Sequence, residues 1–183
     1  MKENNIFSHP LPKKRSEALS KKKWLSLLLC LFLLLSGCGK KETAPEDVIH
    51  AMCKSQSSLP TGCLYVLSAP SDDAKHPSDR WLMAMFGKGD LPAAFSLVED
   101  AAFFTSYTHA CEFAVFLCKT SDGTHAVSQL CLQRLNTLKL YWEGVEASNV
   151  SLQNAGVTTR GKWVILYLCQ DPAEALRAFR RTL

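Results

Sequence analysis

The chain has 183 residues, of which 47% are hydrophobic and 21% charged, and its formal net charge is +4. The positive charge belongs to the N-terminus, because residues 1–37 hold seven of the 21 basic and two of the 17 acidic side chains. The other 146 residues carry 14 basic and 15 acidic side chains and are enough for one domain with a hydrophobic core. This near-neutral remainder lacks the basic balance of a nucleic-acid-binding protein, and that class is excluded.

The N-terminal segment has the pattern of an export signal. A segment with six basic residues between Lys13 and Lys23 precedes the apolar run Trp24–Leu35, and small residues then lead to a cysteine. The run has 12 residues, fewer than the roughly 20 that a membrane-spanning helix needs. The basic residues keep the N-terminal side in the cytoplasm. This order is typical of a cleaved signal peptide, with an uncleaved anchor as the alternative.

The quartet Leu35-Ser36-Gly37-Cys38 resembles the lipobox of bacterial lipoproteins, whose cysteine receives a diacylglyceryl group and becomes the mature N-terminus. The resemblance implies that residues 1–37 are a cleaved signal peptide and that Cys38 holds the protein on the extracytoplasmic face of the cell membrane. Two acyl chains are the minimum for a stable anchor. Residues 38–44 are then a lipid-anchored tether, and residues 45–183 are expected to form a single α+β domain.

Hydrophobic spacing along the domain predicts both helices and strands. The expected elements are a helix at 45–56, a strand at 63–67, a helix at 80–86, strands at 97–107 and 111–118, a helix at 124–140, strands at 150–159 and 162–169, and a C-terminal helix after Asp171. From residue 97 the order is strand–strand–helix–strand–strand–helix, which suits an antiparallel sheet with helices on one face. The predicted fold is therefore a two-layer α+β sandwich.

Local signals define several of these boundaries. Thr43-Ala44-Pro45-Glu46 has the form of a capping box. Ser78 or Asp79 caps the helix at 80–86, and Asp171 is placed to cap the last helix before a first-turn proline. The strands around Phe113–Leu117 and Val164–Leu168 are almost continuously apolar, and we expect them at the centre of the sheet.

Two segments of the domain carry a family resemblance. They are the strand Glu112-Phe113-Ala114-Val115-Phe116 and the terminal unit Gly161-Lys162-Trp163-Val164-Ile165-Leu166-Tyr167, which Asp171 and an arginine-rich helix follow. Together with the lipobox, they resemble the small lipoproteins of low-GC Gram-positive bacteria that contain the domain of unknown function 4358. The resemblance covers about Arg80 to Arg181. That family has no established activity, substrate or catalytic residue, and the cysteine richness of this chain departs from its pattern.

Six cysteines remain once Cys30 in the signal and Cys38 at the anchor are set aside. They are Cys53, Cys63, Cys111, Cys118, Cys131 and Cys169. An exported protein can form disulfides, but the sequence does not choose among the possible pairings. Four of the six lie in apolar periodic segments, where a free cysteine behaves as a small hydrophobic residue. Buried thiols and disulfides both stay open.

Three groups of residues could be read as a redox, a metal or a catalytic site, and each also has a simpler structural explanation. Cys111 and Cys118 are seven positions apart on one strand, so they point to opposite faces and do not form a redox couple. A soft metal site at His50, Cys53 and Cys63 lacks an evident fourth ligand. The third group places His109 beside Cys111 and Glu112, without a residue to orient the histidine or stabilise an oxyanion.

No catalytic, cofactor or metal-binding residue is therefore predicted, and we do not expect an enzyme. Bulky side chains near loops are the best candidate for a binding surface; they are Trp81, Met83, Met85, Phe86, Tyr141 and Trp142. The expected function is a membrane-anchored, non-enzymatic module that interacts with another protein or a small ligand. The alternative is an accessory metal-binding or thiol-redox protein of the cell surface that uses its cysteines.

Overall fold

A computed structural model describes residues 42–87, 89–145 and 149–183. The lipobox residues Leu35, Ser36, Gly37 and Cys38 lie outside the described residues, so the signal peptide and the lipid anchor stay predictions. All elements named below belong to the unit Thr43–Leu183. Within the described residues, no helix combines the length and apolar character needed to cross a membrane.

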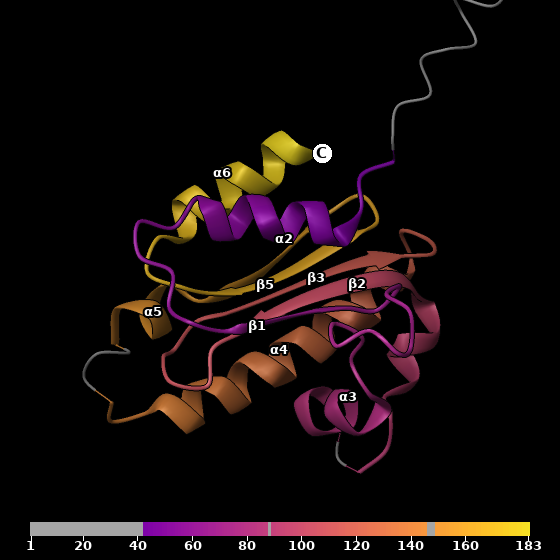
Figure 1. The fold of residues 1–183 in the computed structure, drawn as a ribbon, viewed down its shortest axis with the longest axis horizontal. Helices are drawn as coiled ribbons and strands as arrows, with labels where there is room; N and C mark the ends of the chain where they lie inside the picture. The colour runs from indigo at the N-terminus through magenta and orange to yellow at the C-terminus, as the bar shows by residue number, and fades with distance from the viewer. Residues whose placement is uncertain (1–41, 88, 146–148) are drawn as a thin grey trace, which may run out of the picture. The chain divides into compact units, whose positions relative to one another are not determined.

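The fold is organised around an antiparallel sheet with the strand order β1-β2-β3-β5-β4 (Figure 1). Its strands are β1 (Cys63–Val66), β2 (Val98–Thr105), β3 (Glu112–Cys118), β4 (Gly156–Arg160) and β5 (Trp163–Leu168). β3 is central, paired with β2 on one side and β5 on the other. Gly161 makes the tight turn between β4 and β5 at a φ of +59°, a conformation that glycine adopts at little cost.

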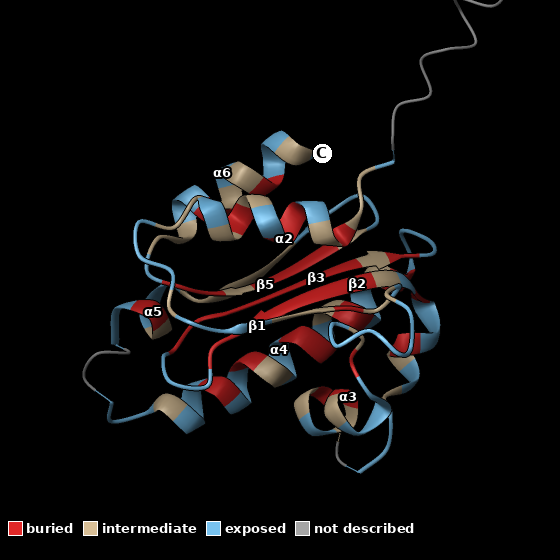
Figure 2. Ribbon diagram, in the orientation of Figure 1, coloured by how far each residue is buried: buried red, intermediate tan, exposed pale blue. Residues whose placement is uncertain are grey.

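Successive side chains of the central strands enter two separate cores. Ala114 and Phe116 of β3 pack in one core together with Leu166, whereas Val115 packs in the other together with Ile165. Figure 2 shows β2, β3 and β5 almost wholly buried. This double burial explains the nearly continuous apolar sequence of β3 and β5, because a strand covered on both faces has no polar side to present.

Helices cover both faces of the sheet (Figure 1). The α4 face is covered by α3 (Asp79–Phe86), α4 (Gly123–Trp142), the short helix α5 (Asn149–Asn154) and the 3-10 turn η1 (Ala93–Leu97). The opposite face, here the α2–α6 face, is covered by α2 (Pro45–Lys54) and α6 (Pro172–Thr182).

The α+β class and the antiparallel sheet are confirmed, but the placement of all helices on one face is wrong. The apolar residues of β3 and β5 point in both directions, so leaving one face uncovered would expose large apolar area to water. α2 and α6 pack side by side over that second face and bury it.

Two local predictions also need correction. The strand predicted at 150–159 begins only at Gly156, because residues 149–154 form α5. The capping box at Thr43–Glu46 does not form: Ala44 occupies the N-cap, and Thr43 Oγ1 donates instead to the carbonyl of Thr182 at the end of α6 (3.3 Å). That bond ties α2 to α6.

The other predicted caps differ from each other. Ser78 caps α3 as expected, accepting a hydrogen bond from the Trp81 amide at 3.2 Å. Asp171 stands at the N-cap of α6 but makes no capping bond. Its carboxylate accepts from the hydroxyl of Ser57 (2.6 Å), so it fixes the loop after α2 rather than the start of its own helix.

Candidate functional site

A buried ion pair lies between α4 and the sheet. Arg134 Nε donates to Glu112 Oε1 at 2.9 Å, and Nη2 donates to Oε2 at 2.7 Å. The side chains are 11% and 4% exposed, respectively. This two-pronged geometry is the strongest arrangement available to an arginine and a carboxylate. A pair of charged side chains with so little solvent exposure distinguishes this site from the apolar core around it.

The sheet register positions the glutamate. Thr105, Glu112 and Leu168 lie side by side on β2, β3 and β5, and all three line the cavity described below. Glu112 shares its face with Ala114 and therefore points toward α4. The Thr105 hydroxyl donates to Glu112 Oε2 at 3.2 Å, so the carboxylate is held by three hydrogen bonds.

The arginine comes from the buried stripe of α4. Val127, Cys131 and Leu138 of that stripe are buried, and Arg134 falls at the same helical spacing. This pair was not predicted from the sequence, although both residues interrupt an apolar pattern. Glu112 begins an otherwise apolar strand and Arg134 interrupts an apolar stripe, which is the signal that marks them.

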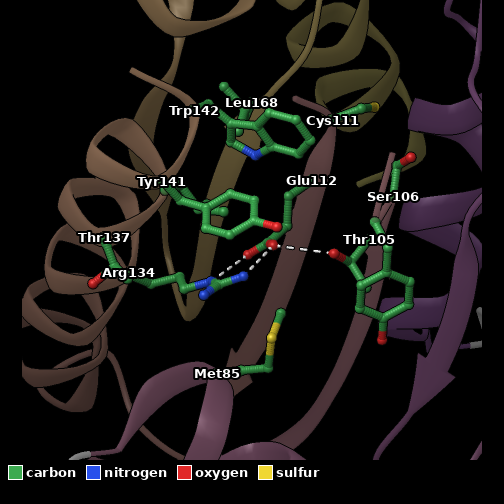
Figure 3. A pocket seen from close by; sticks show the side chains of 12 residues that line it. Met85, Thr105, Ser106, Cys111, Glu112, Arg134, Thr137, Tyr141, Trp142 and Leu168 are labelled. Atoms are coloured by element: carbon green, nitrogen blue, oxygen red, sulfur yellow. Dashed lines mark hydrogen bonds and ion pairs between the residues drawn. The ribbon is translucent and has the colours of Figure 1, made fainter. Parts of the chain in front are cut away.

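A cavity of about 270 Å³ opens over the pair. Figure 3 shows it bordered by the Tyr141 and Trp142 rings at one side and by Met85 at the other. Its lining consists of Met85, Thr105, Ser106, Tyr107, Cys111, Glu112, Arg134, Thr137, Leu138, Tyr141, Trp142 and Leu168. A second cavity of about 230 Å³ adjoins it and shares Cys111 and Trp142.

Aromatic side chains hold one edge of the cavity in place. The Tyr107 hydroxyl lies 3.3 Å from the Tyr65 hydroxyl and accepts a hydrogen bond from Trp81 Nε1 at 3.3 Å. The rings of Tyr65 and Trp81 pack with their centroids 4.4 Å apart. The hydrogen bond to Tyr107, together with partial burial, raises the pKa of Tyr65. These contacts fix Tyr107 although it is 58% exposed.

Of the six bulky residues singled out in the sequence, three line the cavity and one lies in the core. Met85, Tyr141 and Trp142 line the cavity, whereas Phe86 is buried among other phenylalanines. Trp81 supports the cavity edge through Tyr107. The sequence thus predicted the aromatic wall of the cavity, which is Tyr141 and Trp142, but not its charged floor, which is Glu112 and Arg134.

The third group of the sequence analysis, His109 with Cys111 and Glu112, is not arranged as the base and nucleophile of a cysteine hydrolase. His109 Nδ1 shares a hydrogen bond with Thr108 Oγ1 (2.9 Å), and Glu112 is bonded to Arg134. Burial raises the pKa of the Cys111 thiol to about 12, so this thiol is protonated at neutral pH and is a poor nucleophile. The arrangement does not support a cysteine hydrolase.

The proposed soft-metal residues are also engaged separately. His50 Nε2 lies 3.5 Å from Glu46 Oε1 on the outer side of α2, whereas Cys53 packs against the core of the α2–α6 face. In the part of the chain that the structure describes, no three His, Cys, Asp or Glu side chains are grouped so as to hold a metal ion.

All six cysteines of the domain are free thiols. Cys111 and Cys118 lie in different cores, which confirms that they point to opposite faces. Burial raises the pKa of Cys53 and Cys169 to about 12. Thiols with such pKa values carry little thiolate, the form that reacts in thiol–disulfide exchange.

Comparison of the chain with protein-family models, with curated proteins and with solved structures finds no match.

Proposed function

We propose that this chain is a membrane-anchored extracytoplasmic lipoprotein whose domain binds a small ligand in the cavity over Arg134 and Glu112, without catalysing a reaction. The observation that carries the binding proposal is the concave, mainly apolar site with a few convergent polar groups at its floor. Such a site is the usual form of a ligand pocket. The resemblance to lipoproteins with the domain of unknown function 4358 supplies no residue roles and stays a prediction.

The cavity supports binding more than it supports chemistry. The charged groups in its lining are paired with each other, so neither is left unpaired to take up or deliver a proton. Cys111 borders the cavity, but its thiol packs in the core of the α2–α6 face and is protonated. What the lining offers is a shaped wall of rings, hydroxyl groups and a fixed guanidinium.

Ligand binding is tested by a fragment screen read by NMR. Full-length protein is exposed to neutral, cationic and anionic fragments, and the indole N–H signal of Trp142, assigned with a Trp142→Phe variant, reports binding. Thr137→Trp should block the cavity and remove the response. Leu140→Trp on the same helix should not, since Leu140 is 73% exposed and outside the lining. No response to any fragment would refute the binding proposal.

The membrane anchor is tested separately. In a bacterial host, the wild-type chain should lose the mass of residues 1–37, gain a diacylglyceryl group and fractionate with the envelope. Cys38→Ser should carry no lipid and leave the membrane fraction. An unchanged mass and envelope fractionation of that variant would contradict the lipoprotein assignment and favour an uncleaved anchor.

A further inference from the structure

We infer that the ligand of this cavity is a neutral, polyhydroxylated ring of the size of one sugar unit. This inference rests on the proposed function and adds the chemical class of the ligand. It follows from the charge balance of the lining, from its hydrogen-bonding groups and from its aromatic wall.

The charge balance selects a neutral ligand. Of the lining residues, Glu112 and Arg134 are the acidic and the basic one, and they neutralise each other through two hydrogen bonds. A charged ligand would bring a charge into a largely apolar site where the opposite charge is already taken. Burying an unpaired charge in this way is costly.

Three of the five hydroxyl groups of the lining already donate their hydrogen within the protein and offer lone pairs to a ligand. Thr105, Ser106 and Thr137 each donate their hydrogen to an oxygen of the protein. The acceptors are, in that order, Glu112 Oε2 (3.2 Å), the Thr61 carbonyl (2.9 Å) and the Gln133 carbonyl (3.1 Å). A ligand therefore has to donate hydrogen bonds to these groups.

Arg134 offers the complementary groups. A guanidinium has five N–H donors, and the two bonds to Glu112 use only two of them. A ligand therefore also has to accept hydrogen bonds. A hydroxyl group both donates and accepts at the same atom, so several hydroxyls on one small molecule fit a site that mixes donors and acceptors at close range.

The aromatic wall suits the faces of a saturated ring. The Tyr141 and Trp142 rings stand at 87° to each other with centroids 5.1 Å apart, and Tyr141 is 71% exposed. Aromatic faces carry partial negative charge and attract the partly positive C–H groups of a sugar ring. At about 30 Å³ per water, the cavity of about 270 Å³ has the volume of about nine waters, and the covalently bonded atoms of a single sugar ring pack more closely than separate waters do.

The test is an NMR titration of the full-length protein in a detergent without a sugar headgroup. Methyl β-D-glucopyranoside is the neutral probe, and glucosamine and glucuronate are cationic and anionic probes with the same ring. We expect the neutral sugar to shift the Trp142 indole signal with a Kd on the order of 1 mM, as for a small polar ligand. Both charged sugars should bind at least about tenfold more weakly.

Tyr141→Ala provides the residue-level test. It removes an exposed ring from the wall and should weaken binding of the neutral sugar by about tenfold while leaving the thermal unfolding midpoint unchanged. Leu140→Ala is the matched control, because this neighbour is 73% exposed and outside the cavity lining. It should bind the sugar as the wild type does.

The outcomes separate the ligand class from the binding function. Equal or tighter binding of glucosamine or glucuronate would overturn the neutral-ligand inference, as would preferential binding of the neutral amide N-acetylglycine N-methylamide. Fragments that respond without any sugar response would also overturn it, while leaving the binding module intact. If neither sugars nor fragments bind, the proposed function fails as well.

Discussion

The two faces of the sheet differ in how their cores accommodate polarity. On the α4 face, Phe86, Phe95, Phe103 and Phe116 pack ring against ring at centroid distances of 5.4–6.0 Å. Where the sheet ends, this core gives way to the Arg134–Glu112 pair and its cavity.

Within the described residues, the buried core of the α2–α6 face contains no comparable pair. The polar-capable side chains that pack in it include the thiols of Cys53, Cys111 and Cys169, whose raised pKa values keep them neutral. A neutral thiol packs as a small apolar group, whereas a buried ion pair has lost its hydration and needs exact partners. Among the residues that the structure describes, a buried ion pair lies on the α4 face and not in the core of the α2–α6 face, and the binding site is proposed on the α4 face.

The largest expected effects come from the aromatic residues at the centre of each core. Phe116→Ala and Phe113→Ala should each lower the free energy of unfolding by about 3–5 kcal/mol, because both side chains are fully buried. Phe116→Ala should lower the free energy of unfolding more than Phe113→Ala does, since Phe116 contacts three phenylalanine rings and Phe113 contacts one. Urea unfolding at pH 7 measures both; the reverse order would show that ring packing does not distinguish the faces.

Removing one charge of the buried pair should have the next largest effect on the free energy of unfolding. Glu112→Ala leaves Arg134 without its partner and should cost about 3 kcal/mol. The double variant Glu112→Leu/Arg134→Met should recover most of that loss, because neither charge then remains buried. Glu99→Ala is the control: this exposed glutamate lies 4.0 Å from Lys162 and should matter little. If Glu112→Ala were as stable as the wild type, the buried Arg134 would not need the Glu112 carboxylate as its partner.

Most elements of the fold could be predicted because hydrophobic periodicity is a local property. The strand ending at Cys118 and the helix that begins near Thr124 were placed within a few residues of β3 and α4. The face that each helix covers could not be predicted. The apolar stripe of α2, Val48 to Met52, shows that one side of the helix is buried but not against which side of the sheet.

The candidate site was predictable only in part. Tyr141 and Trp142 stood out as bulky residues near a helix end, and both line the cavity. Glu112 and Arg134 were each visible as an exception to an apolar pattern, but they are 22 positions apart. Their pairing depends on the register of β2, β3 and β5 and on where α4 lies, and these are long-range properties that periodicity does not contain.

The thiols of the α2–α6 face should make stability fall at alkaline pH. The pKa of Cys169 is raised from 9.0 to about 12 in the folded protein, so between these values the unfolded chain loses a proton that the folded chain keeps. Unfolding then releases protons, and raising the pH favours it. In Cys169→Val, the unfolding free energy should therefore fall less steeply as the pH rises, by up to about 1.4 kcal/mol per pH unit.

Urea unfolding of both proteins from pH 7 to pH 11 measures this difference. Lysines and tyrosines also titrate there, but equally in the two proteins, so they cancel in the comparison. Near pH 7 the thiol is protonated in both states and the two curves should run parallel. Curves that stay parallel to pH 11 would mean that Cys169 is not kept protonated by the fold.

The smallest effect is expected at the exposed edge of the α2–α6 face, where Lys75 Nζ lies 2.9 Å from Glu46 Oε1. The hydrogen bond from Lys75 lowers the pKa of Glu46 below 4.5, so the pair contributes stability above that pH and loses it as the pH falls. Lys75→Ala should lower the thermal midpoint only slightly at pH 7, and not at all at acidic pH or in 1 M salt, because exposed pairs are screened. A salt-independent loss as large as that of Glu112→Ala would contradict the distinction between exposed charges and the buried pair.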